Sequence, residues 1–312
     1  MSATTHSLPH ATPLLLLKDR YGRIARDLRV SLTDRCNLRC TYCMPAQGLD
    51  WTPSEQLLTD EEIIRLVTIG VRLLGIRQVR FTGGEPLLKK SLDQLIHTVK
   101  QLHTDEGKPV STALTTNRKA TQLKDAGLDR VNISLDTLNP EHFSLLTRRD
   151  RFKDVIAGIE AAINADLSPV KINSVIMPGV NEDDILPLAE FGLYENVELR
   201  FIEQMPLGPR DQWDRSAMVT AQDIIDVIST KFDLTPDTTE ETAHSAAPAT
   251  MWRISDGDMH GKIGIIASVT RPFCGACDRT RLTSDGAVRS CLFSQLKPRC
   301  GISFAKADQT MR

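Results

Sequence analysis

The residues best suited to chemistry in this chain of 312 residues are its seven cysteines, which fall into two groups. The first group is Cys36, Cys40 and Cys43, in a C-x3-C-x2-C pattern. Three thiolates on one short loop can bind three irons of a [4Fe–4S] cube and leave the fourth iron open for a ligand. A structural zinc site needs four ligands. Because no further cysteine or histidine lies near this loop, its pattern favours a cluster with a vacancy.

The second group combines a C-x2-C pair, Cys274 and Cys277, with Cys291 and Cys300. The first three of these could hold another cluster with one free iron. A four-ligand zinc ribbon that also uses Cys300 is the alternative, because C-x2-C is the common zinc half-site. The spacing alone leaves both interpretations open.

The elements that must position these cysteines follow from the alternation of apolar runs and amphipathic segments between Asp27 and Glu203. The alternation predicts six βα units and hence a parallel sheet with right-handed crossovers. Such units build an open doubly wound sheet or a partial or full (β/α) barrel, and in either case ligands lie at the carboxyl ends of the strands. The predicted strands are 28–32, 78–82, 110–115, 130–134, 170–176 and 197–202, and the predicted helices are 59–74, 91–102, 152–165 and 183–191. Since the first cysteine group directly follows the first strand, we expect a site at this mouth.

The pattern changes after residue 205 and predicts three parts: a mobile tail over 1–17, the α/β domain over 18–205, and a smaller α+β unit over 206–312. The last part carries the second cysteine group. Its predicted elements are a helix over 221–232, a polar linker over 236–248, and strands over 251–254, 264–268, 281–283 and 287–291. An Asp285-Gly286 turn joins the last two strands.

Composition limits the classes of partner. The formal net charge is −2, so the molecule as a whole does not attract polyanions, and we expect no nucleic acid partner. No apolar run is long enough for a membrane span or a signal peptide, so we expect a cytoplasmic protein without a membrane partner. An anionic substrate would therefore need a local group of basic side chains.

The first cysteine loop, together with the segment Thr82-Gly83-Gly84-Glu85-Pro86, resembles the radical S-adenosylmethionine superfamily. The resemblance implies a partial (β/α)6 TIM-type barrel. It also implies a [4Fe–4S] cluster whose open iron is chelated by S-adenosylmethionine, which is then cleaved to a 5′-deoxyadenosyl radical. The implied contacts to S-adenosylmethionine are Tyr42, Gly83, Gly84, Glu85, Ser134 and Met205.

The segments 27–29, 200–205 and 273–282 are similar to one family in this superfamily, the GTP 3′,8-cyclases of molybdenum-cofactor biosynthesis. The resemblance implies a lyase in which a radical at C3′ of GTP adds to C8 of the guanine. It implies a second [4Fe–4S] cluster on Cys274, Cys277 and Cys291, whose free iron binds the guanine. The implied catalytic residues are Cys36, Cys40, Cys43, Arg279 and Arg281, and the implied nucleotide contacts are Arg29, Arg80, Thr115, Lys171, Arg200, Arg279, Thr280 and Arg281.

The same resemblance implies an external low-potential electron donor and delivery of the product to the next enzyme of the pathway. It leaves the oligomeric state open between a monomer and a homodimer. Two other interpretations stay open: another radical enzyme with an auxiliary cluster, such as a peptide modifier, and a metal-binding relative with impaired turnover.

The chain departs from the family pattern in two places. Arg118 stands where the family has glycine, and the segment from there to Arg130 is short for a crossover helix, so we expect the loop bearing Thr115 to be disturbed. The chain ends at Arg312 without the Gly-Gly tail of the family, which predicts a truncated C-terminus and impaired turnover. Cys300 has no assigned role.

Overall fold

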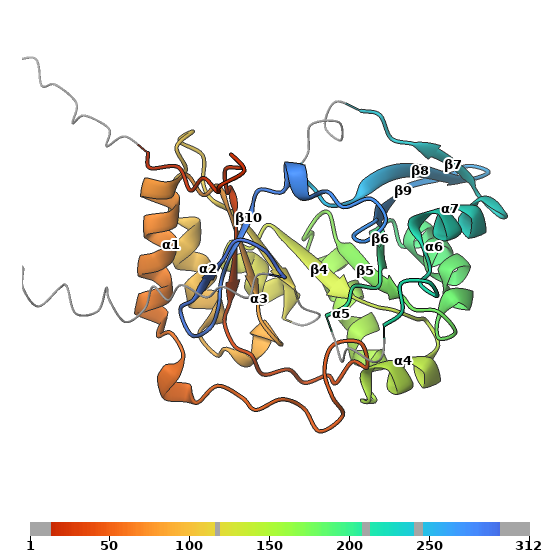
Figure 1. The fold of residues 1–312 in the computed structure, drawn as a ribbon, viewed down its shortest axis with the longest axis horizontal. Coiled ribbons are helices and arrows are strands. Elements are labelled where there is room, and N and C mark those ends of the chain that lie inside the picture. Colours follow the sequence, from red (N-terminus) through yellow and green to blue (C-terminus); the bar gives the residue numbers. More distant parts are fainter. Residues whose placement is uncertain (1–13, 116–118, 208–212, 240–245, 294–312) are drawn as a thin grey trace, which may run out of the picture.

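A computed structural model describes residues 14–115, 119–207, 213–239 and 246–293. Within them, the backbone forms one sheet of 11 strands in the order β11-β10-β1-β2-β3-β4-β5-β6-β9-β8-β7 (Figure 1). The strands are β1 (Asp27–Ser31), β2 (Gln78–Thr82), β3 (Ser111–Thr115), β4 (Arg130–Ser134), β5 (Lys171–Ile176), β6 (Glu198–Glu203), β7 (Asp233–Pro236), β8 (Thr250–Asp256), β9 (Met259–Ile266), β10 (Arg279–Leu282) and β11 (Val288–Arg289).

The described helices cover the outer side of this sheet. Figure 1 shows α1 and α2 at one side of the molecule and α6 and α7 at the other, with the strands between them. The helices are α1 (Asp60–Leu74), α2 (Leu92–Lys100), α3 (Ala120–Asp125), α4 (Pro140–Thr147), α5 (Phe152–Asn164), α6 (Ile185–Tyr194) and α7 (Ala221–Ser229). No helix in these segments is both long and apolar enough to cross a membrane.

The six predicted βα strands form a parallel sheet in chain order, from β1 beside β2 to β5 beside β6. A doubly wound sheet would reverse its strand order at a switch point. Because the order runs from β1 to β6 without reversal, the structure has the (β/α)6 partial barrel arrangement rather than the doubly wound alternative. The predicted fold class is confirmed.

The strands after residue 206 extend both edges of the same sheet. β9 pairs in parallel with β6, and β10 pairs in parallel with β1. The second cysteine group therefore lies beside the first strand, far from it in sequence. The predicted division at residue 205 stays a prediction. Most of the predicted tail lies outside the described residues, but the amides of Leu15 and Leu17 donate to the carbonyls of Leu73 and Leu74.

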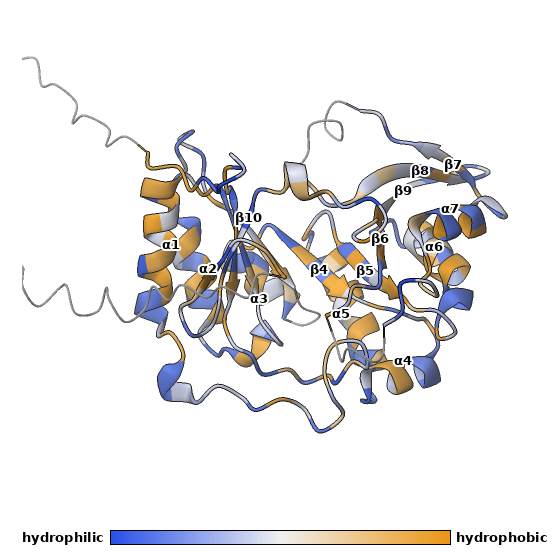
Figure 2. Cartoon of the chain, in the orientation of Figure 1, coloured by the Kyte–Doolittle hydropathy of each residue, from blue (hydrophilic) through white to orange (hydrophobic). Residues whose placement is uncertain are grey.

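The core lies between the strands and the helices. The strands of the central parallel sheet turn apolar side chains toward the helices, as with Val79 and Phe81 on β2, and both of these side chains are fully buried. Helix α1 places Ile63 and Val67 against this layer, and Figure 2 shows the apolar stripes of the helices turned toward the sheet. Each such buried side chain stabilises the fold by about 1.5–3 kcal/mol. The predicted capping box begins α1, since Thr59 accepts a hydrogen bond from the Glu62 amide.

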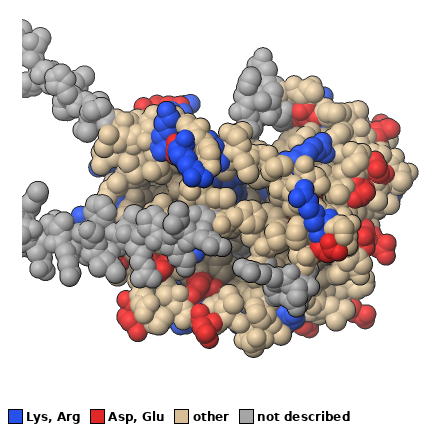
Figure 3. All heavy atoms as spheres, viewed as in Figure 1, with Lys and Arg blue, Asp and Glu red and all other residues tan. Residues whose placement is uncertain are grey.

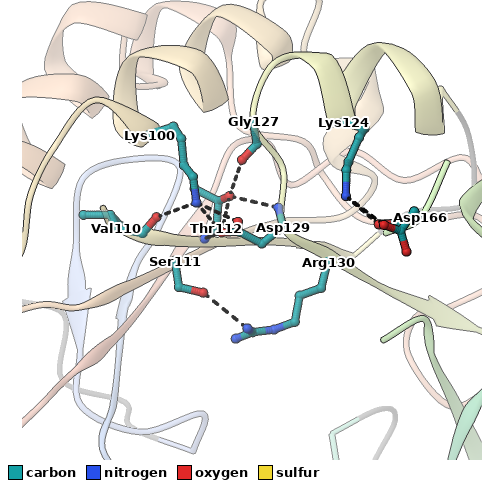
Figure 4. A network of polar contacts seen from close by, with 9 residues as sticks. All are labelled: Lys100, Val110, Ser111, Thr112, Lys124, Gly127, Asp129, Arg130 and Asp166. Carbon is teal, nitrogen blue, oxygen red and sulfur yellow. Dashed lines mark hydrogen bonds and ion pairs between the residues drawn. The ribbon is translucent and has the colours of Figure 1, made fainter. Parts of the chain in front are cut away.

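The loop that follows Thr115 lies outside the described residues, so the predicted disturbance of this loop stays a prediction; the crossover between β3 and β4 is described from residue 119 onward. Helix α3 has only six residues, yet Ala113 pairs with Arg130 in ordinary parallel register. Figure 4 shows the polar contacts that hold the end of this crossover in place. Lys100 Nζ donates to both carboxylate oxygens of Asp129, at 2.6 and 2.7 Å. The same carboxylate accepts from the Thr112 amide at 2.7 Å. Arg118 lies outside the described residues.

Three elements, α3, α4 and β7, were absent from the sequence prediction. Helix α4 begins where the Asn139 side chain accepts from the amides of Glu141 and His142, with Pro140 at the first helical position. This Asn-Pro pair is a helix-start signal that could have been used. Strand β7 ends at Pro236, where the predicted linker begins, and β9 starts five residues before the predicted strand over 264–268. β7 is an exposed edge strand and the first half of β9 is largely exposed, so the apolar pattern is weak in both places.

Candidate active site

A cavity of about 350 Å³ opens on the inner face of the barrel, lined by strand residues and by the loops that follow the strands. Ten of the predicted site residues line it: Arg29, Arg80, Thr115, Arg200, Met205, Cys274, Cys277, Arg279, Arg281 and Cys291. The structure thus joins the second cysteine trio to most of the predicted nucleotide contacts. In the described part of the chain, the first cysteine trio does not belong to this lining.

Three neighbouring strands place a row of arginines in the cavity. Arg29 on β1 is in register with Arg80 on β2 and with Arg281 on β10. Side chains two residues apart on a strand share a face, so Arg279 points the same way as Arg281. We call Arg29, Arg80, Arg279 and Arg281 the arginine row. Figure 3 shows basic and acidic side chains both spread over one face of the molecule, so this concentration of cations is a local feature.

The positive charges of the arginine row repel one another and are partly removed from solvent. Burial, helped by the neighbouring Arg80 charge, lowers the pKa of Arg29 to about 9. Burial also lowers the pKa of Arg80, and burial with the charge of Arg279 lowers that of Arg281. Among the described residues, Nε of Arg29 and Nε of Arg80 are buried without a hydrogen-bond partner. Half-buried cations with free donors are suited to an anion with several oxygens, such as a phosphate chain.

Two predicted nucleotide contacts lie outside the cavity lining. Lys171 points to the inner face but is held by Glu198, whose carboxylate it meets at 2.8 and 3.0 Å. The same carboxylate accepts from Nε of Arg200 at 2.6 Å. Thr280 lies between two cavity arginines, so strand alternation turns its side chain to the other face, where it lines a separate outer cavity of about 210 Å³. The roles of both residues stay predictions.

Several lining residues were not predicted from the sequence. Asn132 and Asn173 stand on β4 and β5 among buried apolar neighbours, and Arg23 comes from the segment before β1. Asn132 accepts from Nη1 of Arg80 at 2.9 Å when its amide is oriented to satisfy both groups. Asn173 Oδ1 is buried and has no hydrogen-bond partner within the described segments. A polar amide inside an apolar strand is a usable sequence signal, whereas nothing local marks Arg23.

The first cysteine loop is a series of tight turns. The amides of Cys43 and Met44 both donate to the Cys40 carbonyl, at 3.0 and 3.1 Å, and the Leu38 amide approaches Cys36 Sγ at 3.4 Å. All three thiols are free. Burial raises the pKa of Cys40 to about 12, and burial also raises the pKa of Cys36 and of Cys43. The apoprotein therefore holds them as thiols, and a metal must displace their protons.

The donor sets fit iron–sulfur clusters better than zinc. A zinc ion draws four ligands to about 2.0–2.3 Å. Within the described residues, no three Cys, His, Asp or Glu side chains converge on a point that would hold a single ion. Each trio nevertheless has three free thiols. Those of Cys36, Cys40 and Cys43 lie on one series of turns, and Cys274, Cys277 and Cys291 line one cavity, as suits a cluster that spreads its ligands over several irons. Cys300 lies outside the described residues.

The end of α4 holds the first cysteine loop. The amides of Arg39 and Thr41 donate to the carbonyls of Thr147 and Leu146, each at 2.9 Å. Arg148 follows with a left-handed φ of 53°, and its Nη1 donates to the carbonyls of Arg39 and Met44, both at 3.1 Å. One guanidinium group therefore ties together the two ends of the segment that contains Cys40 and Cys43.

The glycines of the second superfamily motif are required by close packing. A Cβ on Gly83 would lie 2.3 Å from the Thr33 carbonyl oxygen, and one on Gly84 would lie 2.1 Å from the Arg35 carbonyl oxygen. Gly83 also has a φ of 147°, in the region that favours glycine. The motif thereby lies directly against the backbone before Cys36. Burial raises the pKa of Cys36, and the negative charge of Glu85 acts in the same direction.

The other predicted S-adenosylmethionine contacts are spread over the mouth of the barrel. Tyr42 donates its hydroxyl to Asp136 at 2.9 Å, just beyond the end of β4. Burial raises the pKa of Asp136 to about 6. Ser134 is exposed at the end of β4, and Met205 lines the main cavity. Their contacts to the cofactor, like those of Gly83, Gly84 and Glu85, stay predictions.

The second cysteine loop is tied to the arginine row and to the N-terminal segment. Arg23 Nη1 donates to the Cys274 carbonyl at 2.7 Å, and Arg23 is itself paired with Asp19. Nη1 of Arg279 lies 3.8 Å from Cys277 Sγ. A cluster on this loop would therefore lie at the wall of the cavity, next to the free guanidinium donors.

Two known protein families match consecutive parts of this chain. The family described as Radical SAM superfamily matches residues 30–192, and the family described as Molybdenum Cofactor Synthesis C matches residues 197–302. The chain is 59% identical over 296 residues to a GTP 3′,8-cyclase of Corynebacterium glutamicum, covering 92% of this chain and 78% of that protein. It is 57% identical over 284 residues to a GTP 3′,8-cyclase of Streptomyces coelicolor, covering 89% and 81%.

Solved structures are similar in fold at low identity. Streptococcus suis SuiB bound to the precursor peptide SuiA superposes with a TM-score of 0.58 at 14% identity, over 90% of this chain and 64% of the longer SuiB chain. SuiB bound to S-adenosylmethionine gives a TM-score of 0.54 at 14% identity, over 90% of this chain and 62% of that one. At such identity the similarity concerns the fold alone.

Proposed function

Because this chain belongs to the GTP 3′,8-cyclase family of the radical SAM superfamily, we propose that it converts GTP into 3′,8-cyclo-7,8-dihydro-GTP, the first step of molybdenum-cofactor biosynthesis. The observation that carries the proposal is the meeting of the arginine row with the second cysteine trio in one cavity. A triphosphate carries several negative charges, which the row would neutralise. A purine would then lie toward Cys274, Cys277 and Cys291.

The cofactors expected from the family are two [4Fe–4S] clusters and S-adenosylmethionine, and they supply the radical chemistry when bound. Cys36, Cys40 and Cys43 would hold the first cluster and the second trio the other. The chain's own contribution is to bind the triphosphate, to fix the ribose relative to the guanine, and to exclude water. Fixing two reacting carbons in one bound molecule makes bond formation effectively intramolecular.

The finer assignments follow from this reaction. We class the enzyme as a lyase that takes electrons from an external low-potential donor and passes its product to the next enzyme of the pathway. Free cysteines in both described groups suit a reducing compartment, and we place the protein in the cytoplasm. Both a monomer and a homodimer are compatible with the cavity, since one chain supplies its described lining.

The proposal is tested by anaerobic reconstitution followed by incubation with GTP, S-adenosylmethionine and dithionite, with mass spectrometry of the nucleotide. The expected product is a cyclic isomer of GTP itself, separated from GTP by chromatography before mass spectrometry and formed together with 5′-deoxyadenosine. Cys277→Ala is expected to keep cleavage of S-adenosylmethionine but to make no cyclic nucleotide. Wild-type protein with full iron and sulfide content that leaves GTP unchanged would contradict the proposal.

A further inference from the structure

Asp27 is a buried carboxylate at the base of the arginine row, with only 6% of its surface exposed. Its Oδ2 lies 3.9 Å from Nε of Arg29, 3.9 Å from Nη2 of Arg80 and 4.0 Å from Nε of Arg279. The three cations come from β1, β2 and β10, and Asp27 pairs with Arg279 across the sheet. One carboxylate therefore lies within ion-pair reach of guanidinium groups on three neighbouring strands.

The Asp27 carboxylate offsets the positive charge of these guanidinium groups without accepting hydrogen bonds from the Nε atoms of Arg29 and Arg80. Separations near 4 Å are too long for hydrogen bonds, so the free Nε donors of Arg29 and Arg80 are not engaged by Asp27. Asp27 Oδ1 is buried and also has no hydrogen-bond partner among the described residues. The carboxylate thus differs from Glu198, which binds Lys171 and Arg200 through short hydrogen bonds.

The charge of Asp27 opposes the repulsion within the row. Burial lowers the pKa of Arg29 and of Arg80, and neighbouring guanidinium groups lower it further, whereas Asp27 raises it in both cases. It does the same for Arg281. Without this carboxylate, four half-buried cations would face one another across a cavity whose described lining contains no carboxylate.

We propose that Asp27 is the internal counter-ion of the arginine row: a positioning residue that keeps Arg29, Arg80 and Arg279 together when no anion is bound, while leaving their donors free for a polyphosphate. The proposal rests on the proposed function for the identity of the anion. Asp27 touches neither substrate nor cofactor in this role and acts through the guanidinium groups.

The role has two opposite consequences. Removing the negative charge raises the positive potential of the cavity, so a polyphosphate binds more tightly. The arginines also lose the charge that aligns them, so bound GTP is held in poorer geometry and reacts more slowly. Tighter binding together with slower turnover is not expected of a residue that only supports the fold.

The experiment compares Asp27→Asn with Asp278→Asn in the reconstituted full-length protein, using inorganic tripolyphosphate as the probe. Asp278 is a matched control, because it is an adjacent carboxylate that lines the outer cavity and does not line the main one. In Asp27→Asn we expect a lower melting temperature without anion, a larger stabilisation by tripolyphosphate, and a dissociation constant about tenfold lower. Its kcat with GTP is expected to fall by roughly tenfold or more. Asp278→Asn is expected to change the dissociation constant less than about twofold.

A double-mutant cycle with Arg80→Gln keeps the test decisive if Asp27→Asn alone is insoluble. Removing one cation together with the carboxylate restores the balance of charge, so the double variant should be soluble and more stable than the sum of the single changes predicts. Equal dissociation constants in wild type, Asp27→Asn and Asp278→Asn, or no rescue in the double variant, would overturn the proposal for Asp27. If tripolyphosphate failed to stabilise even the wild type, the anion site of the proposed function would be wrong instead.

Discussion

At the scale of residues, the active-site candidates act through charge and through free donors. The arginine row combines cations with donors that have no partner in the described structure. Binding a polyphosphate would satisfy these donors and remove the repulsion at the same time. The expected affinity therefore depends on individual guanidinium groups more than on the net charge of −2.

The first prediction concerns Arg281. Arg281→Ala should weaken GTP binding by about 1.5–3 kcal/mol, because charge-assisted hydrogen bonds to the phosphates are lost. The dissociation constant of the variant should also depend less steeply on salt than that of the wild type, since fewer charged contacts remain to be screened. Isothermal titration at two salt concentrations measures both. Arg271→Ala removes an exposed charge outside the lining and should leave both quantities unchanged.

At the scale of elements, the strands supply the inner-face residues, and short helix ends hold the loops. The end of α4 supports the first cysteine loop through backbone bonds and through Arg148. The crossover at α3 is held by the contacts of Lys100, Thr112 and Asp129 shown in Figure 4.

The second prediction concerns Arg148, which adopts a left-handed backbone. Arg148→Gly should relieve about 1–2 kcal/mol of strain while removing two hydrogen bonds of similar total value, so the melting temperature should change little. The cysteine loop should nevertheless loosen, and the first cluster should lose iron faster to a chelator. Arg149→Ala, which alters the exposed neighbouring arginine, is the control and should lose iron at the wild-type rate. A large loss of stability in Arg148→Gly would show that its role is mainly structural.

The third prediction concerns Asp129. Burial alone would raise its pKa, but the hydrogen bonds and charge of Lys100 and the hydrogen bonds from Thr112 together outweigh burial and lower the pKa. A carboxyl group with a lowered folded-state pKa stabilises the protein above its unfolded value, about pH 4, and this stabilisation is lost as the pH falls through the folded value. Asp129→Asn should therefore cost about 1–2 kcal/mol at pH 7, allowing for its partial exposure, and less at pH 3. Urea denaturation at both pH values tests this, with Asp166→Asn as the exposed control.

At the scale of the whole molecule, the C-terminal strands complete the sheet on both sides. β10 covers the edge of β1, and β9 covers the edge of β6. Uncovered parallel edges expose a row of unpaired backbone groups and favour aggregation. The strands that flank the second cysteine loop pair with these two edges, and this pairing brings the loop to the cavity.

The fourth prediction follows from this closure. A fragment ending at residue 205 should be insoluble or aggregated, because β1 and β6 would each lose their outer neighbour. Adding the segment 213–312 in trans should improve its solubility, as judged by size-exclusion chromatography. A monomeric, cooperatively folding fragment would instead establish 18–205 as an independent domain, which the sequence predicted.

The sequence by itself determined the features that depend on local pattern. These are the two cysteine groups, the βα alternation with all six of its strand starts placed to within one residue, and the capping box at Thr59. Alternation along a strand is also local, and it places Arg279 and Arg281 on one face and Thr280 on the other. The family resemblance drew on these same local motifs.

Only the tertiary structure decided which distant segments meet. Sequence order gave no reason for β10 to pair with β1, and that pairing is what brings Arg281 beside Arg29 and places Asp27 opposite Arg279. The contacts of Arg23 with Cys274 and of Arg148 with the first cysteine loop likewise join segments far apart in the chain. Edge pairing and such long-range contacts depend on the summed free energy of the whole packing, which no local window of sequence contains.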